Sequence, residues 1–329
     1  MIEEGQVMII TWFKSVWSWL WNIAVYFRSK IDSSSNGHDS DVDGVFIDSA
    51  DNAQRRSRPS IGVARSVPTR KFRNLKDDTV HLTNPYCVVI VNIFYKNRVS
   101  PRNGAQADLE NIQRLLKDSA GFKSVHVHVD VTRRNILEIM DEVSNSSEMD
   151  NHDGLVVFIS SHGKAKGIIM ADNETVKVDE ITSRVNGKQC DSLWGKPKIF
   201  FISACRGKKK DAGATGPQLV TSDSGEDEKL AVRLPTEADF LICYSTSKGF
   251  ISYRRFNLDI KLTPDMGTWL ISTVTQIFEE RMKDEDIMQM LTRVNATVAS
   301  KASGGDHVDG MKQMPVQMHM LRHRVFFGK

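Results

Sequence analysis

Apolar residues gather in short runs from about residue 80 onward, and segments of helical periodicity separate these runs. YCVVIVNIF (86–94), GLVVFIS (154–160), KIFFIS (198–203) and DFLICYS (239–245) are short and rich in β-branched and aromatic residues, which is typical of buried strands. SVHVHV (124–129) alternates between apolar and polar residues and predicts a further strand. Such an alternation of strands and helices predicts an α/β fold with a mostly parallel sheet.

The segments between the strands have the spacing of amphipathic helices. Residues 105–118 place four apolar side chains on one helix face (Leu109, Ile112, Leu115 and Leu116). The segment TRRNILEIMDEVSN predicts a helix for which Thr132 is the N-cap, and two more helices are expected near 267–281 and 284–301. The chain closes with the alternating stretch PVQMHMLRHRVFF, from which a last strand near 322–327 is expected.

The first 79 residues differ from the rest of the chain. Residues 8–27 are mostly apolar, contain four of the six tryptophans, and carry their polar residues on one narrow helical stripe. Such a helix can span a bilayer, lie in the membrane interface, or pack on a protein partner or on the body of this protein. Residues 32–53 are rich in Ser and Asp, and residues 54–76 are basic without an acid, so both predict a linker.

The overall composition limits the possible functions. The 329 residues are 40% apolar, enough for a sizeable core, and the net charge of +3 gives no electrostatic reason to expect nucleic-acid binding. The four cysteines form no CxxC pair, which argues against a thiolate zinc site and against a disulfide framework. We therefore expect a reducing, cytoplasmic setting and no metal or organic cofactor.

Two strand ends carry residues suited to nucleophilic catalysis. The strand 154–160 leads into Ser161-His162-Gly163, and the strand 198–203 leads into Ala204-Cys205. If the strands are parallel neighbours, the histidine and the cysteine share one edge of the sheet, where an imidazole can generate the thiolate. The backbone N–H groups of Gly163 and Cys205 are the candidate donors to an oxyanion. Taken singly, a cysteine at a strand end is more often a core residue, and His-Gly is more often a turn.

The segments FISSHG and FFISACRG resemble the histidine and nucleophile motifs of the caspase family, and Cys205 follows His162 by 43 positions. Further matches are SPRNGAQADLENIQRLL, LPTEADFLICYST, ISYRR, MLTRVNATVA and KQMP. The resemblance covers roughly 80–329. It implies a caspase-like fold with a six-stranded sheet flanked by helices, a large subunit from 80 to 223 and a small subunit from 224 to 329.

The family cleaves peptides after aspartate, and the resemblance implies which residues recognise that side chain. Arg102 and Arg254 match the two arginines that hold the aspartate carboxylate, a task that suits the planar guanidinium. Ser203 stands where the family has glutamine, so aspartate selectivity is expected to be weaker.

The resemblance also implies the other substrate contacts. Ser252 is expected to pair its backbone with the peptide, and Tyr253 replaces a tryptophan beside it. Arg255 departs from the common asparagine and is either a contact to an acidic substrate group or an idle surface residue. Ser100 matches the position whose carbonyl orients the histidine in some members of the family.

Membership in this family would also imply activation by cleavage. Asp223, in the loop 206–233 that lacks periodicity, is the best candidate for self-cleavage, and Asp43 and Asp48 are candidates for release of the N-terminal segment. We expect a homodimer of large and small subunits in which the strand near 322–327 is the edge of the sheet. The leading hypothesis is an aspartate-specific cysteine endopeptidase acting in programmed cell death or a related proteolytic pathway. The alternative is a catalytically weak relative that regulates an active caspase.

Overall fold

The computed structural model describes residues 78–96, 102–211, 235–255, 266–303 and 310–328. All of them belong to one compact unit, residues 70–329. The apolar segment 8–27 and the linker that follows it lie outside the described residues.

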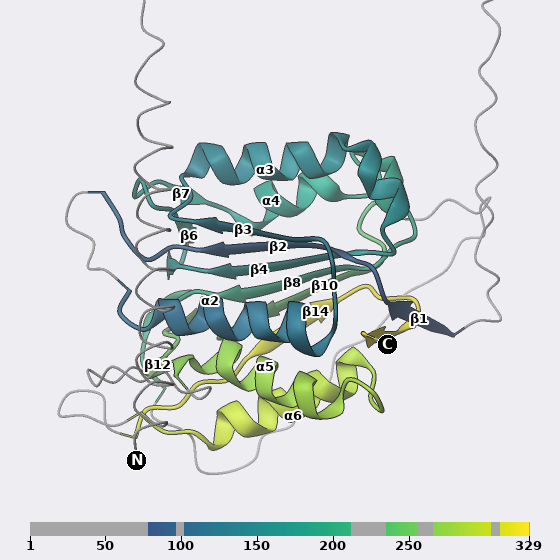
Figure 1. Cartoon of the computed structure of the whole chain (residues 1–329). Helices are drawn as coiled ribbons and strands as arrows, with labels where there is room; N and C mark the ends of the chain where they lie inside the picture. Colours follow the sequence, from purple (N-terminus) through teal and green to yellow (C-terminus); the bar gives the residue numbers. More distant parts are fainter. Residues whose placement is uncertain (1–77, 97–101, 212–234, 256–265, 304–309, 329) are drawn as a thin grey trace, which may run out of the picture. The chain divides into compact units, whose positions relative to one another are not determined.

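The centre of this unit is a six-stranded sheet with the order β14-β10-β8-β4-β2-β3 (Figure 1). Five neighbouring strands are parallel, and β14 is antiparallel to β10, so the predicted mostly parallel sheet is confirmed. The strands are β2 (Tyr86–Val91), β3 (Val125–Val129), β4 (Leu155–Ser160), β8 (Lys198–Ser203), β10 (Phe240–Tyr244) and β14 (Val316–His319).

Helices cover both faces of the sheet (Figure 1). One face carries α2 (Ala105–Gln113), α5 (Trp269–Arg281) and α6 (Ile287–Ser300), and the opposite face carries α3 (Arg133–Asn145) and α4 (Val178–Thr182). The short helical turns are η1 (Arg114–Ser119), η2 (Ser147–Asn151), η3 (Ser183–Val185) and η4 (Asp191–Leu193).

Two of the predicted helices begin at a residue whose side chain caps them. The side chain of Thr132 accepts a hydrogen bond from the backbone N–H of Asn135 at the start of α3. Asp286 forms a capping box with Gln289 at the start of α6, which satisfies backbone donors that the first turn leaves without partners.

The strands read as continuous apolar runs because both of their faces are buried. In β2, Val89 packs into the core under α2 and α5, while Val88 and Ile90 pack into the core under α3. Phe158 of β4 and Phe201 of β8 occupy paired positions in the register and stack with ring centroids 4.4 Å apart. This stacking stabilises the register between β4 and β8, the two strands that lead into the candidate catalytic residues.

The prediction that residues 322–327 form the edge of the sheet is wrong. The edge strands are β14 and β3, and β15 (Arg324–Phe327) instead pairs in parallel with β1 (Thr79–Leu82) in a separate two-stranded sheet. The chain turns away after Met320 because Arg322 forms a forked ion pair with buried Asp239, with distances of 2.9 and 2.7 Å. Phe327 is then buried against Phe122 and Phe278. Its apolar character reflects burial in the core.

Several short strands, paired with one another in small sheets, lie near the carboxyl ends of the parallel strands. These are β5 (His162–Lys164), β6 (Gly167–Ile169) and β7 (Thr175–Val176), then β9 (Gly207–Lys209) with β11 (Gly249–Phe250), and β12 (Arg254–Arg255) with β13 (Gly267–Thr268). Among the described residues, no helix is long and apolar enough to span a membrane.

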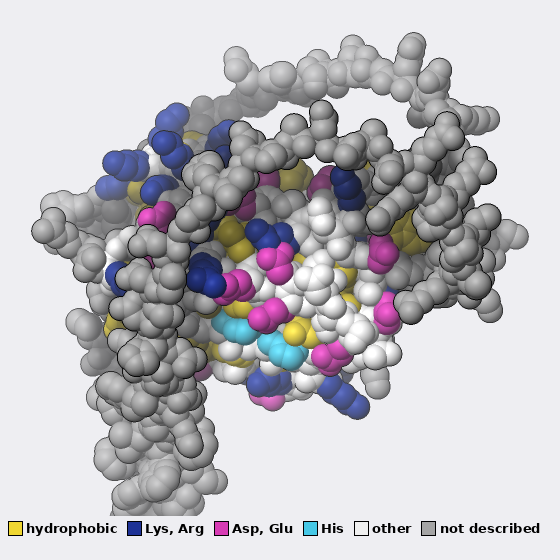
Figure 2. All heavy atoms as spheres, turned by 90° about the horizontal axis from the view of Figure 1, so that it is seen from above, with side chains coloured by type: hydrophobic (Ala, Val, Ile, Leu, Met, Phe, Trp, Pro, Cys, Tyr) yellow, Lys and Arg dark blue, Asp and Glu magenta, His cyan; other side chains and the backbone are white. Residues whose placement is uncertain are grey.

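Charged side chains on the surface over α3 are of mixed sign and lie beside histidines (Figure 2). Three arginines of this region are paired with acids: Arg133 with Glu180, Arg134 with Glu138, and Arg184 with Asp141. This surface therefore has no large field of one sign.

Candidate active site

The backbones of the predicted histidine and cysteine segments touch at the carboxyl edge of the sheet. Ser160 at the end of β4 and Ser203 at the end of β8 are paired in register, so the residues after them leave the sheet side by side. A Cβ atom added to Gly163 would lie 2.2 Å from the carbonyl oxygen of Cys205 and 2.9 Å from the Cβ of Ala204. Only glycine permits this approach, which brings His162 and Cys205 to one site.

The thiol of Cys205 is half-buried, in contrast to the other three cysteines of the chain, which are buried. Burial raises the pKa of the Cys243 thiol to about 12 and raises the pKa of the Cys87 thiol further, so neither is a nucleophile at neutral pH. The Sγ of Cys205 lies 3.5 Å from the backbone N of Ser252, which donates to it, and 3.6 Å from the Ser252 Oγ.

Tyr95, which the sequence did not single out, holds the segment of His162. Its hydroxyl accepts a hydrogen bond from the backbone N–H of His162 at 2.9 Å and is hydrogen-bonded to the Ser161 Oγ at 2.9 Å. The ring centroids of Tyr95 and His162 are 5.0 Å apart. Burial raises the pKa of Tyr95, so the hydroxyl stays protonated over the physiological range. Its position just after the strand 86–94, at the shared sheet edge, is the signal that could have identified it.

Arg102 is buried beside the two strand ends, with a relative exposure of 2%. Its guanidinium donates to the Asn92 carbonyl oxygen at 2.9 Å and to the Ser160 Oγ at 2.8 Å. The Nε atom of Arg102 and the Oγ of the equally buried Ser203 have no hydrogen-bond partner among the described residues. Unsatisfied polar atoms of this kind are costly unless a ligand supplies their partners.

Asp108 of α2 is the counter-charge of Arg102, and sequence reasoning also missed it. One oxygen of its carboxylate lies 3.6 Å from the Arg102 guanidinium and accepts from the Ser160 Oγ at 2.5 Å. The other oxygen accepts from the backbone N and the Oγ1 of Thr268, at 2.7 and 3.0 Å. Gly267 has a φ of +97°, and an added Cβ there would lie 2.4 Å from this carboxylate. Glycine is therefore required on both grounds.

Arg254 adds a second guanidinium to this region. It is half-buried, and its pKa is lowered first by burial and then by repulsion from Arg102. Two arginines thus share one described carboxylate, that of Asp108, with the hydroxyl of Ser203 unpartnered nearby. The local excess of positive charge favours the binding of a further anion. A carboxylate suits this place because it can accept hydrogen bonds from the planar guanidinium of arginine.

Comparison with known proteins agrees with this geometry. Residues 84–326 match the family model described as "Caspase domain". The chain is 35% identical to caspase-3 of Mus musculus over 248 residues, which are 73% of this chain and 83% of the relative. It is 30% identical to caspase-7 of Gallus gallus over 250 residues, 73% of this chain and 76% of the relative. The chain belongs to the caspase family.

A solved structure supports the family assignment at the level of the fold. The crystal structure of caspase-1 from Spodoptera frugiperda is similar with a TM-score of 0.66 and 25% sequence identity, covering 78% of this chain and 95% of that chain. The caspase-like fold predicted from the motifs is therefore confirmed, and the chain is a member of a family of cysteine proteases.

The remaining predicted substrate contacts of this caspase lie along residues 252–255. The backbone N–H of Tyr253 donates to the Gln313 Oε1 at 2.5 Å, and its ring lies 5.1 Å from that of Trp269. Gln313 is buried and also donates to the Ser245 carbonyl oxygen at 2.8 Å, so it ties this segment to the body of the fold. The backbone of Arg255 pairs with Gly267, and its side chain lies outside the described part of the structure.

Several predicted residues fall outside the described residues altogether. These are Ser100, the candidate cleavage positions Asp43, Asp48 and Asp223, and the apolar segment 8–27. They remain predictions from the sequence.

Proposed function

We propose that this caspase is an endopeptidase that cleaves after aspartate, with Cys205 as the nucleophile and His162 as its base. The observation that carries the proposal is the pair of arginines, Arg102 and Arg254, beside the half-buried thiol, together with the unpartnered hydroxyl of Ser203. An aspartate side chain in this position would neutralise the excess positive charge and supply acceptors to unsatisfied donors.

The proposed reaction assigns one chemical step to each of these groups. His162 takes the thiol proton of Cys205, and the thiolate attacks the carbonyl carbon of the scissile bond. The N–H groups of Gly163 and Cys205 stabilise the negative oxygen of the tetrahedral intermediate. The proton then passes from the imidazole to the leaving amine, the C–N bond breaks, and water hydrolyses the resulting thioester. The released acid and amine account for all atoms.

The selectivity of the site depends on how the carboxylate is held. Arg102 is fixed by Asn92 and Ser160 and so presents a guanidinium that needs little reorganisation. Ser203 is shorter than the glutamine of related caspases, so aspartate is expected to be held with fewer direct bonds and through water. We expect preference for aspartate over asparagine, with a smaller margin than a glutamine would provide.

The proposal includes activation of a zymogen. Cleavage after Asp223 would separate a large subunit, residues 80–223, from a small subunit, residues 224–329, and cleavage after Asp43 or Asp48 would remove the N-terminal segment. Two such units would pair through β14, which is one of the two edge strands of the sheet. We place the enzyme in the cytoplasm, with membrane or protein contact through residues 8–27 as an additional feature.

The test is hydrolysis of the fluorogenic peptide Val-Thr-Ser-Asp, which copies residues 220–223, against the same peptide ending in asparagine. The full chain should cleave the aspartate peptide at least tenfold faster, and Cys205→Ala should abolish cleavage. Ser203→Ala should raise KM for the aspartate peptide and leave the slow reaction of the asparagine peptide nearly unchanged. Equal turnover of both peptides would refute aspartate selectivity.

A separate experiment tests whether the chain cleaves itself after Asp223. The intact chain and Cys205→Ala are expressed in parallel, and the fragments are sized by mass spectrometry. Fragments that end at Asp223 should form only when Cys205 is present. Identical processing of both proteins would show that another protease makes the cut.

The second candidate function is regulation of an active caspase by a relative with little activity. Ser203, in place of the family's glutamine, is the observation that favours it. A folded chain that turns over no aspartate peptide, yet changes the rate of an active caspase when the two are mixed, would support this function.

A further inference from the structure

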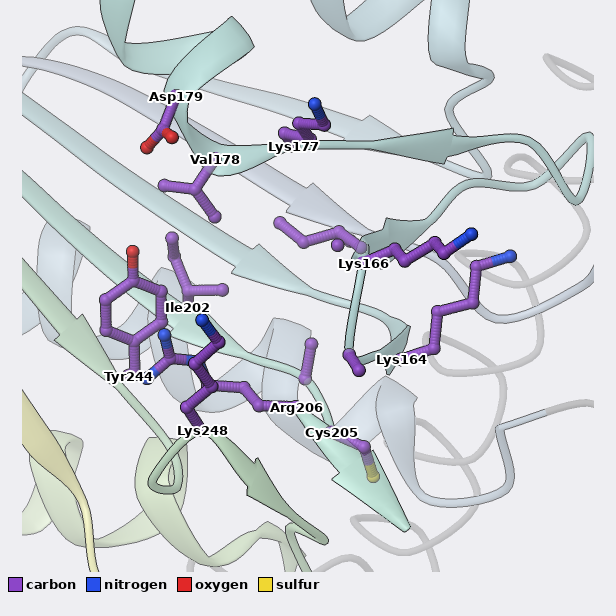
Figure 3. A pocket seen from close by; sticks show the side chains of 14 residues that line it. Lys164, Lys166, Lys177, Val178, Asp179, Ile202, Cys205, Arg206, Tyr244 and Lys248 are labelled. Carbon is purple, nitrogen blue, oxygen red and sulfur yellow. The ribbon is translucent and has the colours of Figure 1, made fainter.

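A cavity of about 670 Å³ lies beside Cys205 (Figure 3). It is distinct from the site formed by Arg102, Arg254 and Ser203, which we call the arginine site. One wall is the turn between β5 and β6, and another is formed by the end of β8 and the residues after β10. Its lining contains Ala204 and Cys205, but it contains none of residues 252–254. The cavity therefore adjoins Cys205 without including Arg102, Ser203 or Arg254.

The cavity is strongly basic. Five cationic side chains line it, and Asp179 is its one acidic lining residue. The cations are Lys164, Lys166, Lys177, Arg206 and Lys248. In Figure 3 the amino groups of Lys164 and Lys166 extend from the hairpin turn, while Arg206 and Lys248 lie on the opposite side beside Tyr244.

Arg206 gives this surface a rigid element. Its guanidinium carbon lies 3.9 Å from the centroid of the Tyr244 ring, and Nη1 donates to the Thr246 carbonyl oxygen at 3.4 Å. Stacking on an aromatic ring holds a guanidinium in place while leaving donors free. The lysines are exposed, and within the described residues none of the four forms an ion pair, in contrast to the paired arginines over α3.

The direction in which the substrate chain runs through the site decides which part of it reaches the cavity. With the aspartate side chain between Arg102 and Arg254, the amino-terminal part of the substrate runs along residues 252–255. The carboxyl-terminal part must then leave on the other side of Cys205, past Gly163 and toward Lys164 and Lys166. An extended peptide advances about 3.3 Å per residue, so a cavity of this size takes side chains several positions after the cut.

We propose that this cavity binds an acidic segment of the substrate that follows the cleaved bond by about three to five residues. The inference rests on the proposed function for its orientation, and it adds a second determinant of substrate choice. The chain itself contains such a segment, because Asp223 is followed by Ser-Gly and then by Glu226, Asp227 and Glu228. The acids at the third to fifth positions are opposite in charge to the five cations that line the cavity.

Exposed ion pairs are individually weak, so the effect is expected to come from several acting together. Each such pair changes an affinity by no more than about fivefold, and three together give about tenfold at low ionic strength. Salt screens charges at exposed sites, so the difference should fall to about twofold in 0.5 M NaCl.

The first experiment measures binding and needs no catalysis. A fluorescein-labelled peptide copying residues 218–230 is titrated with the full-length Cys205→Ala protein, and fluorescence anisotropy is recorded. The same is done with a peptide in which the acids at 226–228 are replaced by Gln, Asn and Gln. The acidic peptide should bind about tenfold more tightly. Equal affinities would overturn the inference whether or not the protein is an active protease.

The second experiment locates the binding. The double variant Lys166→Gln/Lys248→Gln should lose most of the preference for the acidic peptide. The matched control, Lys123→Gln/Lys283→Gln, removes two exposed lysines outside the cavity and should keep that preference. If both double variants lose the preference equally, the effect is one of overall charge and the assigned site is wrong.

The third experiment separates this inference from the proposed function. Turnover of the small reporter Val-Thr-Ser-Asp with a fluorogenic leaving group involves no residue after the aspartate. The Lys166→Gln/Lys248→Gln variant should therefore cleave the reporter normally and cleave the acidic peptide about tenfold more slowly. Failure to cleave the reporter would refute the proposed function, while the binding difference would still stand or fall by itself.

Discussion

Replacement of Asp108 by asparagine tests the electrostatic design of the arginine site. Asp108 is wholly buried, faces the Arg102 guanidinium at 3.6 Å, and accepts hydrogen bonds from Ser160 and from two atoms of Thr268. An asparagine side chain has one accepting oxygen, so its amide group must face a donor at one of these two ends. The change also leaves Arg102 buried without a counter-charge.

The expected cost follows from these contacts. Loss of a hydrogen bond to a charged group costs about 1.5–3 kcal/mol, and breaking a buried ion pair from one side costs about 3–5 kcal/mol. The two figures describe overlapping interactions, so we expect Asp108→Asn to lower the free energy of unfolding by about 4 kcal/mol. Urea unfolding followed by far-ultraviolet circular dichroism measures this difference.

Two further variants make the test specific. Asp118→Asn changes an exposed carboxylate in the turn that continues α2, and it should alter stability by less than about 0.5 kcal/mol. Arg102→Met combined with Asp108→Asn removes the unpaired charge and should recover at least about 1.5 kcal/mol relative to the sum of the single changes. A loss below about 1 kcal/mol for Asp108→Asn, or additivity in the double variant, would refute the assignment of Asp108 as the counter-charge.

Three other predictions concern the thiol, the histidine segment and a buried lysine. Iodoacetamide should label Cys205 alone in the native protein, as measured by peptide mass spectrometry, because the other three cysteines are buried; rapid native labelling of a second cysteine would contradict this. Tyr95→Phe removes the acceptor of the His162 N–H and should lower kcat about fivefold with little change in KM; an unchanged kcat would show that the hydroxyl does not position the base. Burial lowers the pKa of Lys198 to about 8 from 10.5, so between these values the unfolded chain binds more protons and stability should rise with pH, by up to about 3 kcal/mol. Lys198→Met should remove that rise in urea titrations from pH 7.5 to 10.5, and identical pH profiles for both proteins would contradict the assignment.

Much of the fold could be read from local patterns. The runs that became β2, β4, β8 and β10 are apolar between their end residues because both faces of the sheet are covered, and no surface position interrupts them. The cap at Thr132 is a local signal of the same kind, since its hydrogen bond closes within three residues. The closing strand was misplaced because alternation specifies an extended chain and says nothing of its partner. The ion pair between Arg322 and Asp239 joins residues far apart in the sequence, and it redirects the chain toward β1.

For the candidate site, too, some features depend on local sequence and others on tertiary contacts. The sequence by itself determined which residues are chemically able to act, because His162 and Cys205 follow apolar strands and stand within motifs of the caspase family. Only the tertiary structure decided how they are supported. The roles of Asp108 and Gln313 have no local signature, and for Tyr95 the sequence shows only its place after a predicted strand, since all three act through contacts with residues distant along the chain. The basic cavity likewise exists only because the β5–β6 turn and the residues after β8 and β10 meet at one edge of the sheet, where their like charges face one space.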